Sequence, residues 1–138
     1  MSSPEETFVA RVNAITAVSA LIGGRVYPIQ PPEGVTLPCV VYELSGDNPI
    51  NSAGGATGTH ETHIAAHLLA STYANVKALA AAMLGDESTT SPSGLSGWAD
   101  TSGNIWHLDS QRDAPGELIT GQDVREYQGV DQEYTVWN

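Results

Sequence analysis

The sequence predicts an α+β fold, in which one antiparallel sheet of about four to five strands carries two helices on one of its faces. Three observations support this fold class. Two segments, 4–21 and 72–84, repeat apolar residues at helical spacing. Several short runs of β-forming residues alternate with Gly, Pro and polar stretches, as in strands joined by hairpins. The 138 residues contain no internal repeat or linker, so we expect 1–138 to form a single domain.

The first helix has a recognisable start and end. Ser3 can cap it, Pro4 suits the first helical position, and Glu6 completes a capping box. Gly23 and Gly24 then stop the helix, which we place at about 4–21. Its apolar face is formed by Phe8, Val12, Ile15, Val18 or Ser19, and Ile22.

The next stretch predicts strands separated by polar connections. Residues 25–28 read as a short extended segment, and the proline-rich 29–36 as a connection. Residues 37–44 predict a strand, with Pro38 at its first position, where the missing N–H does least harm. Residues 46–58 contain almost no apolar side chains, so we expect a mobile hairpin connection or arm there.

The middle of the chain is ambiguous at one point. Residues 59–70 fit either a strand or an N-terminal extension of the following helix, and we favour the strand. The helix itself begins at Ser71 or Thr72 and ends before Gly85. Residues 86–103 are rich in Ser, Thr and Gly and predict a second mobile arm. Leu95 and Trp98 are expected to anchor that arm to the body.

The C-terminal third predicts two further strands. One spans about 104–111, around Trp106, and the other lies within 124–137 and ends at the Tyr134–Trp137 run. A polar turn at 113–123 separates them.

The charge balance excludes several kinds of partner. Sixteen acidic residues face five basic ones, for a net charge of -11, and the basic residues are scattered. No basic patch can neutralise phosphates, so we expect neither nucleic-acid binding nor attraction to an acidic membrane. No apolar run reaches about 20 residues, and no signal peptide is recognisable, so a cytosol-like compartment is expected. The acidity either serves solubility or forms a wall past which DNA slides.

His60, His63 and His67 invite a metal-site interpretation, but their spacing does not match the zinc-protease motif. In a helix, His63 and His67 could chelate one ion; in a strand they would lie about 13 Å apart. Cys39 is expected to be a buried core residue. We therefore expect no metal, no cofactor and no enzymatic activity, with a small metal-dependent hydrolase using the three histidines as the rival.

The ordered elements resemble a known family. The junction 21–28, LIGGRVYP, the strand 36–42, TLPCVVY, the strand-and-helix stretch 63–84 and the closing strand 132–137 are similar to the tail-completion or tail-terminator proteins of siphovirus-like phage tails. Cys39 stands where an aromatic residue is commoner in the family, and His67 where an apolar or aromatic residue is usual. The likeness covers most of the chain.

The resemblance implies a virion structural protein of the tail or neck, made in the host cytoplasm. Such proteins form a ring, usually a hexamer, that caps the tail tube and stops its polymerisation. The ring joins the tail to the head–tail connector or stopper protein, and DNA passes through its lumen without specific binding. Another neck component, a head-completion stopper or an adaptor ring protein, is the alternative. We expect contacts with partners to involve Asp47, Asn48, Pro49, Ile50, Asn51, Trp98, Arg112 and Arg125.

Overall fold

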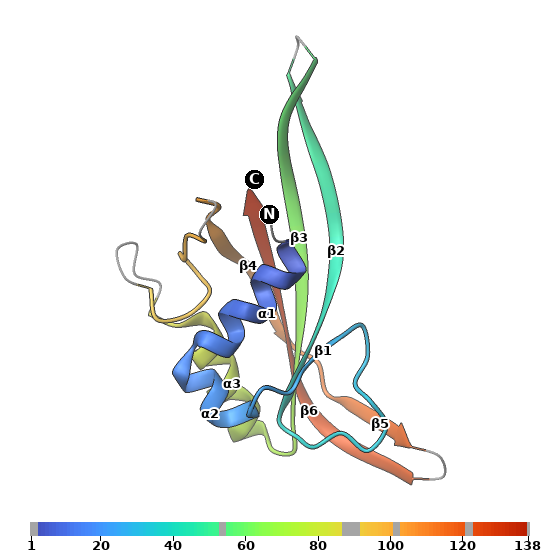
Figure 1. Ribbon diagram of the computed structural model, residues 1–138. Coiled ribbons are helices and arrows are strands. Elements are labelled where there is room, and N and C mark those ends of the chain that lie inside the picture. The colour runs from blue at the N-terminus through green and yellow to red at the C-terminus, as the bar shows by residue number, and fades with distance from the viewer. Residues whose placement is uncertain (1–2, 53–54, 87–91, 101–102, 121–122, 138) are drawn as a thin grey trace.

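The computed structural model describes residues 3–52, 55–86, 92–100, 103–120 and 123–137. For residues 48–52, 55–60, 120 and 123 the description is confined to the backbone. Within these ranges the chain forms three helices and six strands, which Figure 1 labels in chain order. The α+β class is therefore confirmed, whereas the predicted numbers of helices and strands are too low.

One mixed sheet organises the molecule. Its strand order is β1-β2-β3-β6-β4, and β5 pairs with the lower part of β6. All neighbours are antiparallel except β1, which runs parallel to β2 because the connection 29–38 carries the chain back to the same end. The prediction of a purely antiparallel sheet was therefore wrong. The strands are β1 (Val26–Pro28), β2 (Cys39–Ser52), β3 (Gly55–Ala70), β4 (Trp106–Asp113), β5 (Gly116–Thr120) and β6 (Asp123–Trp137).

The predicted first helix is two helices, α1 (Pro4–Ala14) and α2 (Thr16–Ile22). Ile15 breaks the continuity with an extended backbone at ψ 108°, although its side chain stays buried. The break changes the helix direction while Phe8 and Val12 of α1 and Val18 and Ile22 of α2 all remain in the core. As predicted, Ser3 caps α1 through Glu6 N–H, and α2 ends at Gly23 in the left-handed conformation.

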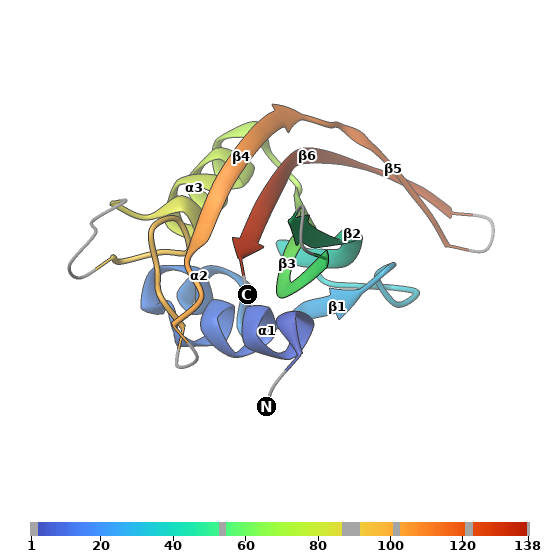
Figure 2. The ribbon, with the colours of Figure 1, turned by 90° about the horizontal axis from the view of Figure 1, so that it is seen from above.

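Helix α3 (Tyr73–Leu84) follows β3 directly and is capped by Thr72, whose hydroxyl accepts from Asn75 N–H. The three helices gather on one side of the curved sheet (Figure 2). Between the two layers lies the main hydrophobic core. Its largest buried side chains include Phe8, Leu79, Met83, Trp106 and Tyr134. No helix in the described ranges is long and apolar enough to cross a membrane.

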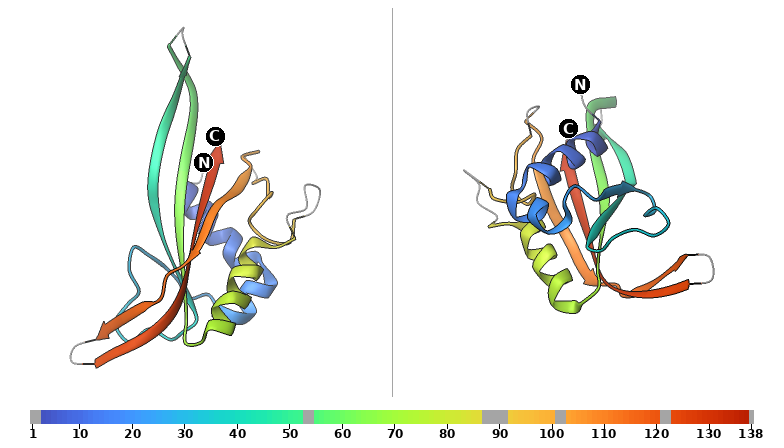
Figure 3. Two further views of the ribbon diagram at one scale, coloured as in Figure 1. Left: turned by 180° about the vertical axis from the view of Figure 1, so that it is seen from behind. Right: turned by 60° about the horizontal axis from the view of Figure 1, so that its bottom comes forward.

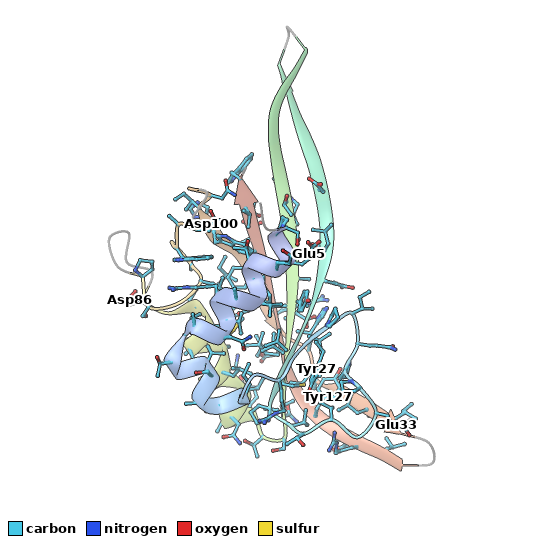
Figure 4. All side chains as sticks on the ribbon, viewed as in Figure 1. Glu5, Tyr27, Glu33, Asp86, Asp100 and Tyr127 are labelled. Carbon is cyan, nitrogen blue, oxygen red and sulfur yellow. The ribbon has the colours of Figure 1, made fainter. Side chains whose placement is uncertain are left out.

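A smaller second cluster covers part of the opposite face of the sheet. It contains Cys39, Val41 and Leu69, together with Val35 from the 29–38 connection. Tyr27 of β1 and Tyr127 of β6, both labelled in Figure 4, pack against this cluster. The second cluster thus seals only the lower end of this face, next to the β5–β6 hairpin.

Two hairpins extend away from this body, as the two views in Figure 3 show. The longer one, β2–β3, rises far above the rest of the molecule (Figure 1). Residues 59–70 lie in β3, so the prediction of a strand there is confirmed. The 46–58 segment is not a connection without secondary structure, because β2 continues to Ser52 and β3 starts at Gly55. Its polar side chains misled the prediction, since these two strands extend beyond the core and pair with each other.

The shorter hairpin, β5–β6, corrects a second prediction. Residues 113–123 were expected to form a polar turn, but residues 116–120 form β5 and pair with 123–127 of β6. In the predicted arm 86–103, residues 87–91 and 101–102 lie outside the described residues. Of the rest, Leu95 is fully buried and Trp98 packs against the main core, which confirms that they anchor the segment.

Candidate functional site

The face of the sheet opposite the helices is open above the second cluster. Along β3, the even-numbered side chains from Thr62 to Leu68 are buried on the helix side, and the odd-numbered ones point to the other face and are half-buried. The neighbouring strands add many acidic groups to this face. We call this set the acid–histidine face; its members are Glu43, Glu61, His63, His67, Asp109, Arg112, Asp131, Glu133 and Thr135.

His67 lies between two carboxylates from the strands on either side of β3. Its Nδ1 is 2.7 Å from Asp131 Oδ1 on β6, and its Nε2 is 3.2 Å from Glu43 Oε1 on β2. Partial burial by itself lowers the pKa of His67, but the hydrogen bonds to Asp131 and Glu43 outweigh it, and the net effect raises the pKa above its ordinary value. The imidazole therefore joins three strands through charge-assisted hydrogen bonds.

His63 makes a second cross-strand link one step nearer the hairpin. Its Nε2 is 2.8 Å from Glu61 Oε1, and its Nδ1 is 3.1 Å from Thr135 Oγ1 on β6. The Thr135 hydroxyl in turn donates to Asp109 of β4. Asp109 and Glu133 oxygens also lie 3.7 and 3.9 Å from His63 Nδ1. This network spans β3, β6 and β4.

The acid–histidine face is accessible to solvent. The side chains of Glu43, Asp109 and Glu133 are 46–47% exposed. Between His67 and the β4 strand lies an open depression of about 470 Å³ lined by Glu43, Arg112, Asp131 and other residues. Carboxylates outnumber positive groups here, so the depression favours basic groups over anions.

The geometry supports neither a metal site nor a hydrolytic triad on this face. His63 and His67 are four residues apart on an extended strand, about 13 Å along the chain at the usual rise. Among the described side chains, no group of three or more His, Cys, Asp or Glu residues is arranged to hold a metal ion. The side chain of His60 lies outside the described residues.

Thr135, His63 and Glu61 are hydrogen-bonded in series, as the nucleophile, base and acid of a catalytic triad are. However, Thr135 is only 4% exposed, and its single hydroxyl hydrogen is given to Asp109. It cannot transfer that hydrogen to His63 without losing this bond. The arrangement therefore fits a structural hydrogen-bond network. Cys39 is likewise not poised for attack, because burial raises its thiol pKa to about 11, and its prediction as a core residue is confirmed.

The predicted interface residues do not converge on one site. Asp47 lies exposed at the base of the β2–β3 hairpin, where it accepts a long hydrogen bond of 3.5 Å from Thr62 Oγ1. Residues Asn48, Pro49, Ile50 and Asn51 follow it in β2, with their side chains outside the described residues. This part of the interface prediction stays a prediction.

Trp98 lies on the helix side of the sheet, whereas the acid–histidine face is on the opposite side. The Arg11 guanidinium carbon sits 4.8 Å from its ring centroid, and the Trp106 ring is 6.1 Å away. Arg11 Nη2 also donates to the carbonyl oxygens of Pro92 and Gly94, at 2.9 Å each. Trp98 therefore holds the 92–100 segment against α1, and whether it also meets a partner is untested.

The two predicted arginines occupy different places. The Arg112 side chain is 81% exposed and approaches Asp131 at 3.5 Å on the acid–histidine face. Arg125 Nη2 donates to Val35 O at 2.5 Å and so fastens the 29–38 connection to β6. Only Arg112 belongs to the candidate site.

Sequence reasoning missed the partners that other strands supply to the two histidines. Glu43, Asp109, Asp131, Glu133 and Thr135 come from three other strands, and only the strand register brings them together. One local signal was present: in β3 the polar residues 61, 63 and 67 alternate with the buried residues 62, 64, 66 and 68, which marks a single polar face.

The comparisons with known proteins agree with this fold. The model of the family described as "Tail completion protein gp17" matches residues 6–108, from the first turn of α1 into β4. The chain belongs to this family. The chain is accordingly a structural component of a phage-type virion, as the resemblance implied.

A solved structure is also similar over nearly the whole chain. A chain of a "Virion of native gene transfer agent (GTA) particle" superposes with a TM-score of 0.53 at 17% identity, covering 97% of this chain and 95% of that chain. At this identity the likeness establishes the fold of the tail completion protein, including β5 and β6, which lie beyond the family match. No curated protein matches the sequence.

Proposed function

We propose that this tail completion protein forms a ring, with six copies as the expected number, that caps the tail tube and ends its polymerisation. The same ring joins the tail to the head–tail connector, and DNA passes through its lumen. The observation that carries the proposal is the family match combined with a sheet that sends a long two-stranded hairpin away from its body.

The β2–β3 hairpin is suited to contacts between subunits or with the tube. Beyond Glu61, the last residue of β3 paired with β6, its two strands pair only with each other. Backbone groups on the outer edges of such strands are available for strand addition to another chain. Asp47 stands at the base of this hairpin, followed by the predicted contact residues 48–51.

The distribution of charge favours a channel through which DNA moves freely. Each of the five basic side chains is engaged within the chain. No group of uncommitted basic side chains is thus left to bind phosphates, and the net charge of the chain is -11. An acidic lumen repels DNA and keeps it from sticking. A purely structural role without catalysis is part of the proposal, supported by the hydrogen bonds of Thr135 and His63, which fit a structural network.

Deletion of the gene in the phage tests the proposal. We expect tails of uncontrolled length that do not join heads, seen by electron microscopy of lysates. Mutant tails of normal length that still join heads would refute it. If tails instead keep their length but fail only at joining, the protein is another neck component, such as a stopper or an adaptor ring protein.

A second experiment tests the hairpin. Replacing residues 48–60 by a two-residue turn should leave the fold intact by circular dichroism and abolish capping of purified tail tubes. A matched control replaces residues 88–90 with glycine and serine, and this variant should cap normally. Equal capping by both variants would exclude the hairpin from the contact.

A further inference from the structure

The β2–β3 hairpin leaves the sheet at an irregular point. Leu44 of β2 pairs with Ile64, whereas Gly46 pairs with His63, so Ser45 is an extra residue in the ladder. A bulge of this kind bends a strand locally. A Cβ added to Gly46 would lie 3.5 Å from His63 Cδ2, so the imidazole packs directly against the bare backbone of the bulge. The base of the hairpin is therefore in contact with one of the two histidines.

The hydrogen bonds of both histidines are complete only when each ring carries two hydrogens. A carboxylate accepts and never donates, so His67 can satisfy both Asp131 and Glu43 only as an imidazolium. The Thr135 hydroxyl gives its hydrogen to Asp109, so it must accept from His63 Nδ1, while His63 Nε2 donates to Glu61. Both sites are built around the charged form.

We propose that His63 and His67 form a proton-controlled clamp at the base of the β2–β3 hairpin. With both imidazoles protonated, the clamp holds β2, β6 and β4 to β3 and fixes the hairpin against the sheet. When the protons leave, each ring loses a donor and the hairpin becomes free to bend at the Ser45 bulge. This inference concerns the isolated chain and does not depend on the ring.

Loss of the imidazolium protons changes the balance of charge around the clamp. The carboxylates facing the two rings are Glu43 from β2, Glu61 from β3, Asp131 and Glu133 from β6, and Asp109 from β4. The exposed His107 of β4 lies on the same face, opposite Thr135. Against these five carboxylates, the face holds one guanidinium, Arg112, which is 3.5 Å from Asp131. Without the two imidazolium charges, the carboxylates on adjacent strands repel one another. The raised pKa of His67 is consistent with this, because its neighbours stabilise the charged form.

The clamp can be tested by measuring the position of the hairpin directly. Spin labels are placed at S52C in β2 and N13C on the exposed side of α1, and the distance distribution between them is recorded. Cys39 is buried and its thiol pKa is raised to about 11, so it stays unlabelled. Measurements at about pH 5.5 and about pH 9 bracket the ordinary titration of histidine. Nitrogen chemical shifts of the imidazole rings report their protonation in the same samples.

We expect a narrow distribution at the lower pH that broadens or shifts at the higher pH, where His67 loses its second ring proton. In the His63→Gln/His67→Gln double variant, the distribution should be the same at both pH values. The matched control is His107→Gln, which alters an exposed histidine of β4 and should keep the wild-type response. Identical distributions while the rings titrate would overturn the clamp. So would rings that keep their protons throughout, or a pH response that survives in the double variant.

Discussion

The Tyr134 hydroxyl donates a hydrogen bond of 2.6 Å to Gln132 Oε1, and both side chains are completely buried. Gln132 Nε2 donates in turn to Ala80 O of α3 and to Gln111 Oε1 of β4, at 3.1 Å each. One buried amide thus connects α3, β4 and β6 beneath the helical layer. Burial also raises the pKa of the Tyr134 hydroxyl, so it stays protonated and remains a donor.

Removing either partner of this pair should be costly. Tyr134→Phe leaves Gln132 Oε1 buried without its donor, and we expect a loss of about 1–3 kcal/mol in the free energy of unfolding. Gln132→Leu should cost at least as much, because the tyrosine hydroxyl and the Gln111 amide oxygen lose a partner. The double variant should cost less than the two single losses added together. Urea unfolding of all three variants measures this, and strictly additive losses would show that the two side chains act independently.

The end of α3 crosses the 92–100 segment without room for a side chain. A Cβ on Gly85 would lie 2.2 Å from Gly94 N, and the φ of Gly85 is +74°. Gly85 also has ψ -158°, a backbone region essentially confined to glycine. Gly85→Ala should therefore destabilise the protein by more than the roughly 1–3 kcal/mol that the strained backbone alone would cost. The matched control is Gly24→Ala, at φ +83° with open space around it. Thermal melts that give the two variants equal stability would rule out a steric role for the crossing.

The stability of the protein should depend on pH through His67. Its pKa is raised in the folded state, so its contribution is complete below the unfolded value of about 6.5 and is lost as pH rises through the folded value. The stability difference between the wild type and His67→Gln should consequently be largest near about pH 6 and shrink toward about pH 9. Denaturant unfolding across this range measures it. A difference that grows with rising pH would contradict the assigned hydrogen bonds.

Zinc should leave the protein unaffected. His63 is bonded to Glu61 within β3 and His67 to Asp131 of β6, and the two histidines are too far apart along the strand for one ion. We expect no change in Tm on adding zinc in slight excess, and none on adding a chelator. Stoichiometric zinc binding that disappears in His63→Ala would instead support the metal-dependent hydrolase that the histidine spacing first raised.

The predictable parts of the fold are those with local signals. The Ser3 cap, the Gly23 stop and the Thr72–Gly85 helix all rest on neighbouring residues, and the sequence specifies them directly. The break at Ile15 is not signalled by a Gly or Pro in the sequence. It occurs where α1 and α2 pack onto one curved sheet. The outer parts of β2 and β3 and all of β5 were read as polar connections, since strands that leave the core need no apolar face.

The candidate site is harder to predict from the sequence, because it has few local signals. The histidines were noticed because three of them cluster in the sequence. Their partners lie up to 72 residues away and depend on two bulges, at Ser45 in β2 and at Asp109 in β4, that set the register. The chain is so acidic that no sequence spacing distinguishes the carboxylates of this face from the others. They belong to Glu43, Glu61, Asp109, Asp131 and Glu133.

The place of β6 in the sheet has a consequence for how the chain folds. β6, the last of the described strands, lies inside the sheet between β3 and β4, and pairs Trp137 with Glu61 and Gln128 with Ala70. Neither neighbour can complete its ladder until residues 128–137 have been synthesised and have left the ribosome. Until then the apolar inner surfaces of the helices and of β3 are exposed, so the nascent protein depends on rapid late closure, or on chaperones, to escape aggregation.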